Sequence, residues 1–254
     1  MNKITNKVLK SWYKFWGYIL ILPNYVLYKY SNPKTLIILG MHRSGTSCIT
    51  RILNLCGVYL GPSLLAPQND NPEGFWENSY VFEINEKILQ QSGGSWDNPP
   101  QNLKVTFFDK LAMMNVLYNR NNSILGIKDP RLLITWEAWE PLIKNYCIVG
   151  IFRHPLSVSK SLNKRNNFDI AKGMDLWKQY NNKLINFTKN EDVILIDFDD
   201  FGSFKNKISN VLAKINLKFN EEALNYYNPS NRSCDYIDSI EDDEASNLYN
   251  SLKN

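Results

Sequence analysis

The chain has 254 residues, 44% of them hydrophobic, which is enough apolar material for one domain with a full hydrophobic core. Its formal net charge of +4 suits an anionic ligand but does not require nucleic acid, and none is expected as a partner. The four cysteines form no C-x-x-C pair and the two histidines stand in different motifs, so no metal is expected and reduced cysteines favour a cytoplasmic location.

Residues 1–34 form a basic, aromatic N-terminal segment with six lysines and no acidic residue. Its uninterrupted apolar part is shorter than the roughly 20 residues that cross a bilayer. Aromatic side chains beside lysines are typical of the membrane interface, so one interpretation is peripheral contact with the inner face of the membrane. Two other interpretations of this segment are a helix packed on the domain and a single-pass membrane anchor.

The central motif, Thr35–Ser47, is an apolar run that ends in a polar turn and opens into a helix. The spacing of Gly40 and Gly45 resembles the phosphate-binding loop of nucleoside triphosphatases, where backbone N–H groups and a helix N-terminus bind phosphate. Thr46 replaces that loop's lysine, which argues against ordinary ATP or GTP chemistry, and Arg43 places a cation inside the loop instead. The alternative is a plain strand, turn and helix capped by Ser44. The predicted site for a nucleotide 5′-phosphate comprises His42, Arg43, Ser44, Gly45, Thr46 and Ser47.

Residues 58–103 are predicted to be mostly loop, with one helix over about 79–91. A loop this long inside a compact domain usually carries function. Its acidic and aromatic residues follow the phosphate loop closely, which indicates an acceptor pocket with a general base. For any single acid, the alternative is a solvated surface carboxylate. The acids are Asp70, Glu73, Glu77 and Asp97.

A second strand is predicted to end at Lys128, within the run Lys128-Asp129-Pro130. Ligands of parallel α/β sheets bind at the carboxyl ends of the strands, so Lys128 is a candidate for the cation that the phosphate loop lacks. The alternative is an ion pair between Lys128 and Asp129 or another acid.

A third strand, over 147–152, is predicted to end at Arg153, and the helix that follows carries Ser161 on its second turn. Both side chains can reach one anion. We expect Arg153 to have no acidic partner and to bind a second phosphate. The alternative is that it caps a backbone carbonyl.

Helices alternate with strands throughout, and the strands are almost continuously apolar, which predicts an α/β fold. We expect a P-loop-like, three-layer α/β/α domain with a central parallel sheet over residues 35–234. Residues 235–254 are predicted to be an acidic, solvated C-terminal tail.

Together these motifs resemble those of sulfotransferases that use 3′-phosphoadenosine 5′-phosphosulfate, specifically the bacterial carbohydrate-type branch, with a distant likeness to protein-tyrosine sulfotransferases. Gly40–Ser47 is similar to the family's 5′-phosphosulfate loop, and Arg153 followed by Ser161 is similar to its 3′-phosphate motif. Lys128-Asp129-Pro130 resembles its Lys-Asp-Pro, and the segments 71–77 and 94–97 also look like this branch. The likeness covers residues 35–200, about two thirds of the chain.

The resemblance implies 3′-phosphoadenosine 5′-phosphosulfate as the donor, no metal, and a hydroxyl acceptor on a glycan, glycolipid or related molecule. Arg43 and Lys128 are then catalytic cations, and the general base is Glu77, with Glu73 second and Asp70 third. His42, next to the loop, is an outside candidate for the base. Arg232 folds back over the 3′-phosphate in this interpretation.

Two other classes of function are kept. The first is a P-loop phosphotransferase acting on a small metabolite, against which Thr46 counts strongly. The second is a non-catalytic nucleotide-binding partner protein, for which replacing Lys128 or Glu77 leaves function intact.

Overall fold

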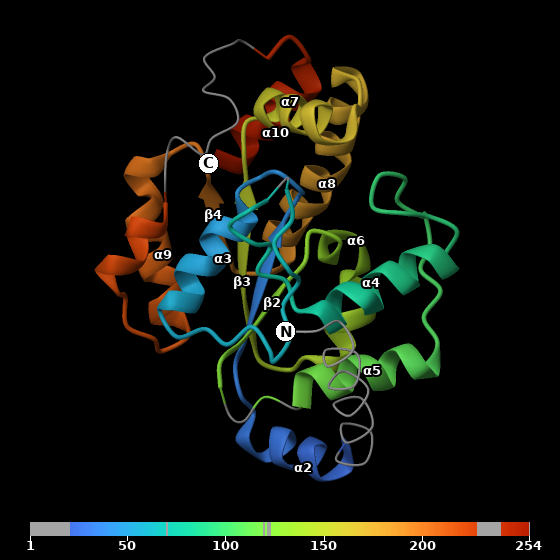
Figure 1. Cartoon of the computed structure of the whole chain (residues 1–254), viewed down its shortest axis with the longest axis vertical. Coiled ribbons are helices and arrows are strands. Elements are labelled where there is room, and N and C mark those ends of the chain that lie inside the picture. Colours follow the sequence, from blue (N-terminus) through green and yellow to red (C-terminus); the bar gives the residue numbers. More distant parts are fainter. Residues whose placement is uncertain (1–20, 70, 119, 121–122, 228–239, 254) are drawn as a thin grey trace.

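A computed structural model describes residues 21–69, 71–118, 120, 123–227 and 240–253 (Figure 1). Its centre is a four-stranded sheet in the order β2-β1-β3-β4, in which every neighbouring pair is parallel. The carboxyl ends of the strands therefore meet at one edge of the sheet. This confirms the predicted α/β fold with a parallel sheet. The strands are β1 (Thr35–Gly40), β2 (Leu125–Lys128), β3 (Tyr146–Phe152) and β4 (Val193–Asp197).

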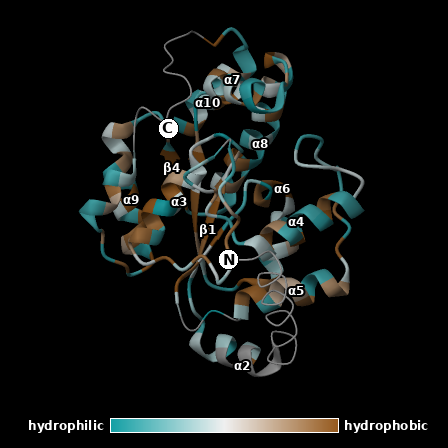
Figure 2. Ribbon diagram, viewed as in Figure 1, coloured by the Kyte–Doolittle hydropathy of each residue, from teal (hydrophilic) through white to brown (hydrophobic). Residues whose placement is uncertain are grey.

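Helices cover both faces of the sheet, because successive side chains of a strand point to opposite sides. Leu36 and Ile38 of β1 pack into one hydrophobic core, whereas Ile37 and Leu39 pack into the other. Figure 2 shows the hydrophobic residues concentrated on the strands and on the inner sides of the helices. The result is three layers, α/β/α.

The layer on the side of Leu36 is the smaller of the two, and the long loop between α3 and α4 leads from it to the other layer. It contains α3 (Thr46–Leu55), α9 (Phe201–Lys214) and the short helix η2 (Glu221–Tyr226). The opposite layer contains α2 (Ile21–Ser31), α4 (Ser79–Gln91), α5 (Phe107–Tyr118), α6 (Leu132–Trp139), η1 (Glu140–Leu142), α7 (Pro155–Asn166), α8 (Ile170–Asn190) and α10 (Asp243–Lys253).

The described part of the N-terminal segment is helix α2, which packs on α5. The rings of Tyr25 and Tyr28 lie 5.4 and 4.7 Å from the ring of Tyr118. This agrees with a helix packed on the domain, while contact with a membrane stays a prediction and residues 1–20 lie outside the described part. Within the described ranges, no helix is both long and apolar enough to cross a membrane.

The expectation of a solvated C-terminal tail is wrong for Asp243–Lys253. These residues form α10, which packs against α8 and β4 and buries Ala245, Leu248, Tyr249 and Leu252 in the core. The prediction relied on the acidic composition and overlooked the apolar face of an amphipathic helix. The acids gather before and in the first turn of this helix, where negative charge stabilises a helix N-terminus.

Replacing Leu252 with alanine tests the packing of α10. Leu252 is 1% exposed, so the cavity left by Leu252→Ala should lower the free energy of unfolding by about 2–5 kcal/mol in a urea titration. Asn250→Ala, at an exposed position of the same helix, is the control and should change it by less than about 0.5 kcal/mol. Equal, small effects of the two variants would contradict the docking of α10.

Candidate functional site

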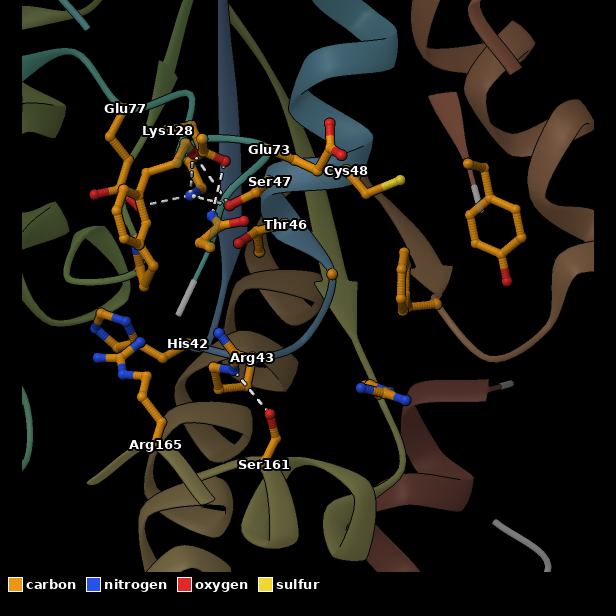
Figure 3. Close-up of a pocket in the computed structure, with 18 of the residues that line it drawn as sticks. His42, Arg43, Thr46, Ser47, Cys48, Glu73, Glu77, Lys128, Ser161 and Arg165 are labelled. Atoms are coloured by element: carbon orange, nitrogen blue, oxygen red, sulfur yellow. Dashed lines mark hydrogen bonds and ion pairs between the residues drawn. The ribbon is translucent and has the colours of Figure 1, made fainter. Parts of the chain in front are cut away.

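A pocket with a volume of about 180 Å³ lies where β1, β2 and β3 end (Figure 3). Its walls come from the loop between β1 and α3, from the segment 71–77, from α7 and from residues that follow β4 and η2. Most of the predicted site residues line it. These are His42, Arg43, Gly45, Thr46, Ser47, Glu73, Glu77, Lys128, Arg153 and Ser161. Ser44 is buried in the loop behind the pocket wall, and Asp70 and Arg232 lie outside the described residues.

The loop between β1 and α3 requires its two glycines. A Cβ on Gly40 would lie 2.5 Å from the carbonyl oxygen of Ile151, and a Cβ on Gly45, where φ is +84°, would lie 2.2 Å from the ring of Phe198. Helix α3 begins directly afterwards at Thr46, and the first N–H groups of a helix have no acceptor within it. These N–H groups and the helix dipole make this wall of the pocket suitable for an anion.

Lys128 lies at the end of β2, with its side chain 1% exposed, and its ammonium group is held by three acceptors. The Nζ atom donates to Glu77 Oε1 at 2.6 Å, to the carbonyl oxygen of Phe75 at 2.9 Å and to Ser47 Oγ at 3.2 Å. Ser47 also donates to the carbonyl oxygen of Phe75 at 3.1 Å. The predicted catalytic cation and the first-choice base therefore form one buried ion pair beside the phosphate loop. The ion-pair alternative for Lys128 thus describes its state in this structure, with Glu77 rather than Asp129 as the partner.

Burial raises the pKa of the Glu77 carboxyl, and the charge of Lys128 opposes this effect without cancelling it. Glu73 lines the same pocket but is exposed. A carboxyl group whose pKa lies above its usual range is better matched to proton transfer near neutral pH than an exposed one.

Backbone strain is concentrated at this pocket. Among the described residues, the non-glycine positions with positive φ are three asparagines, which tolerate it, together with Arg43 (φ 67°) and Trp76 (φ 56°). A strained residue of this kind costs on the order of 1–3 kcal/mol and persists only where its surroundings enforce it. Trp76 lies between Phe75 and Glu77, the two residues of the segment that bind Lys128, and its indole Nε1 donates to Tyr226 Oη at 3.1 Å.

Two of the three arginines that line the pocket, Arg43 and Arg153, have partners that the sequence did not predict. Arg43 Nε donates to Ser161 Oγ at 2.8 Å, so the phosphate loop and α7 are directly connected. The expectation that Arg153 has no acidic partner is wrong: its Nε atom donates to Asp199 Oδ1 at 3.1 Å. Asp199 follows β4, and its place after the carboxyl end of a strand was the signal that could have identified it.

His42 is almost completely buried, and its ring lies 4.5 Å from that of Trp96. Burial and then the surrounding cations, Arg131 and Arg165 first, lower its pKa well below the usual value, so the imidazole is neutral. A lowered pKa means that the imidazole accepts a proton less readily, so His42 is a weaker base than an ordinary histidine.

Sequence reasoning missed the aromatic side of the pocket. Phe198 follows β4, Tyr226 is the last residue of η2 and Tyr227 follows it; all three line the pocket. Arg165 of α7 adds a fourth cation to Arg43, Lys128 and Arg153. Among the residues that the structure describes, no three His, Cys, Asp or Glu side chains are close enough to hold a metal ion. Cations and aromatic side chains therefore line the same pocket.

The sequence matches no family model and no curated protein. Among solved structures, the chain is similar to the sulfotransferase domain of the olefin synthase from Synechococcus PCC 7002, with a TM-score of 0.56 and 13% identity over 87% of this chain and 94% of that one. A sulfotransferase from Mycobacterium tuberculosis matches with a TM-score of 0.48 and 11% identity over 99% of this chain and 87% of that one, a score too low to support a shared fold by itself. The first similarity shows that the chain has the fold of that sulfotransferase domain.

Removing Lys128 tests the buried ion pair. Lys128→Met leaves the Glu77 carboxyl buried without its partner, so we expect the free energy of unfolding to fall by about 3–5 kcal/mol at neutral pH. The loss should be smaller in acid, because a buried carboxyl whose pKa is raised is stable in its protonated form and destabilises the fold as rising pH removes the proton.

The double variant Lys128→Met/Glu77→Leu is the control, because it removes both charges. It should regain most of the stability in the same urea titrations. A double variant as unstable as Lys128→Met would contradict the pairing.

Proposed function

We propose that the protein is a sulfotransferase that moves a sulfuryl group from 3′-phosphoadenosine 5′-phosphosulfate to a hydroxyl of a glycan, glycolipid or related acceptor. The observation that carries the proposal is one pocket that combines the N-terminus of α3, the side chains of Arg153 and Ser161, and the buried pair Lys128–Glu77. The sulfotransferase fold supports it.

The two walls suit a nucleotide that carries phosphate at both ends of its ribose. The N-terminus of α3, with the hydroxyls of Thr46 and Ser47, would hold the 5′-phosphate. Arg153 and Ser161 would hold the 3′-phosphate from the end of β3 and from α7. Thr46 in place of the lysine of nucleoside triphosphatases disfavours ATP as the donor.

In the proposed reaction an acceptor oxygen attacks the sulfur in line, and the bond between sulfur and the bridging oxygen of the 5′-phosphate breaks. Lys128 and Arg43 stabilise the negative charge that develops on the bridging and non-bridging oxygens. Glu77 takes the proton of the acceptor hydroxyl, for which its raised pKa is suitable. Lys128 must exchange its contact with Glu77 for one with the donor, which also frees the carboxylate to act as a base.

The glycan or glycolipid acceptor and the cellular location belong to the same proposal. Acids and aromatic residues of the 58–103 segment lie beside the proposed sulfuryl site and would contact the acceptor. The basic, aromatic residues 1–34 support a cytoplasmic enzyme in peripheral contact with the inner face of the membrane, where glycolipid acceptors are within reach.

Calorimetric titration with adenosine 3′,5′-bisphosphate tests the donor site. We expect a dissociation constant in the micromolar range, weaker binding of ATP with magnesium, and a loss of about 10- to 100-fold in Arg153→Ala, because a charge-assisted contact to phosphate is removed. Lys183→Ala, an exposed lysine of α8, is the control and should bind like the wild type. Tighter binding of ATP than of the bisphosphate, or an unchanged affinity in Arg153→Ala, would overturn the proposal.

Glu77→Gln tests the general base. We expect kcat for sulfuryl transfer to an added hydroxyl acceptor to fall by about 10²- to 10⁴-fold, while the affinity for the bisphosphate changes by only a few fold. In the wild type, kcat should rise with pH through the raised pKa of Glu77, since a base acts only when deprotonated. Glu73→Gln, at the exposed acid of the same pocket, is the matched variant. If kcat fell more in Glu73→Gln than in Glu77→Gln, the general base would be Glu73 and not Glu77.

A further inference from the structure

We propose that helix α10 belongs to the donor site, with Tyr249 as a positioning residue that orients Arg153 toward the 3′-phosphate. The inference rests on the proposed function, because it assigns a phosphate to Arg153. Neither the phosphate motifs nor the pocket lining includes α10, but a chain of hydrogen bonds behind the pocket connects this helix with Arg153.

The first link is Asp199, which holds the end of β3. One carboxylate oxygen, Oδ1, accepts from Arg153 Nε at 3.1 Å, and the other, Oδ2, accepts from the backbone N–H of His154 at 3.0 Å. Arg153 is almost completely buried at the pocket wall. The position of Asp199 therefore helps to set the direction in which the guanidinium group points.

The second link is Asp197, the last residue of β4. Its Oδ1 atom accepts from the backbone N–H of Asp199 at 3.0 Å, and its backbone carbonyl accepts from the N–H of Asp200 at 3.2 Å. A carboxylate that accepts from the N–H two residues later forms a local turn. Asp197 thus shapes the turn that presents Asp199 to Arg153.

The third link joins this turn to α10. Tyr249 Oη donates to Asp197 Oδ2 at 3.0 Å, and Lys253 Nζ lies 3.7 Å from the same oxygen. Asp197 and Tyr249 are both buried, and a buried carboxylate depends strongly on the few donors that reach it. Tyr249 and Lys253, about a hundred positions beyond Arg153 in the sequence, thereby hold Asp197 in place. Asp197 in turn supports Asp199, the acidic partner of Arg153.

The backbone of Arg153 accepts a further hydrogen bond, from helix α8. The indole Nε1 of Trp177 in α8 donates to the Arg153 carbonyl oxygen at 2.9 Å. The ring of Tyr249 packs against Phe152, His154 and Trp177, with centroids 5.8, 5.3 and 6.4 Å away. Tyr249→Phe keeps this packing and removes only the hydroxyl, so the variant isolates the hydrogen-bond chain from the stability of the core.

The experiment compares the binding of adenosine 3′,5′-bisphosphate with that of adenosine 5′-monophosphate, which lacks the 3′-phosphate. We expect Tyr249→Phe to lower the affinity for the bisphosphate by about 3- to 10-fold, which is the effect of one buried hydrogen bond. The affinity for the monophosphate should stay unchanged. In an Arg153→Ala background, Tyr249→Phe should have no further effect beyond about two-fold, because the two residues act through one chain. If Tyr249 had only a structural role, Tyr249→Phe would lower the affinities for both nucleotides by the same factor.

Tyr146→Phe is the matched control. Its hydroxyl also donates to a carboxylate, Glu191 Oε1 at 2.8 Å, but lies at the start of β3, away from the pocket. It should leave both affinities unchanged. Equal weakening of the two nucleotides by Tyr249→Phe, or losses that add to those of Arg153→Ala, would overturn the role of Tyr249 alone. Wild-type protein that prefers the monophosphate to the bisphosphate would overturn the proposed function and this inference with it.

Discussion

The burial of the Lys128 ammonium group is the constraint on which the site depends. A buried cation needs a counter-charge and an acceptor for each of its N–H groups. These come from Ser47 at the start of α3 and from Phe75 and Glu77 of the long loop. One charge at the end of β2 therefore ties the phosphate loop and the loop before α4 to the same point. The left-handed backbone of Trp76 is part of this arrangement, because the residues on both sides of it contact Lys128.

A second polar network supports the opposite wall of the pocket. Arg153 is held by Asp199, Asp199 by Asp197, and Asp197 by α10. Both networks follow the same physical rule, since a buried charged group persists where its hydrogen bonds are completed. Each uses a segment distant in the chain to complete a residue at a strand end. The arrangement of the charged groups in the pocket thus depends on the whole domain rather than on its loop motifs alone.

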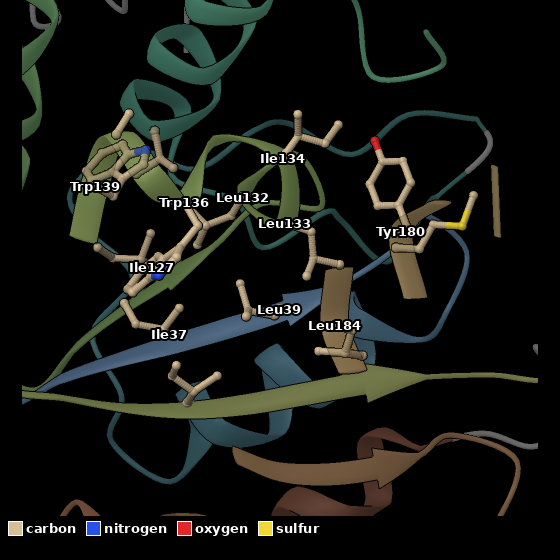
Figure 4. Packing of buried hydrophobic residues seen from close by; sticks show 14 of the residues in the cluster. Ile37, Leu39, Ile127, Leu132, Leu133, Ile134, Trp136, Trp139, Tyr180 and Leu184 are labelled. Atoms are coloured by element: carbon tan, nitrogen blue, oxygen red, sulfur yellow. The ribbon is translucent and has the colours of Figure 1, made fainter. Parts of the chain in front are cut away.

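The core surrounding these networks is simpler. Ile37 and Leu39 of β1 contact the layer that contains Leu133 and Leu184, as Figure 4 shows, while their neighbours along the strand face α3 and α9. Nothing in this packing is specific to a reaction. It brings the ends of the strands to one edge of the sheet, and there the charged residues replace the apolar ones.

The sequence by itself determined the parallel α/β fold, its strands, and the placing of His42–Ser47, Lys128 and Arg153 at strand ends, because these follow from apolar periodicity and from residues adjacent in the chain. It did not determine which groups satisfy those charges. The pairs Lys128–Glu77, Arg43–Ser161 and Arg153–Asp199 join residues 46 to 118 positions apart, and α10 packs in the core despite its acidic start. Only the tertiary structure decided these contacts, since the energy of burying a charge depends on neighbours that the chain brings together when it folds.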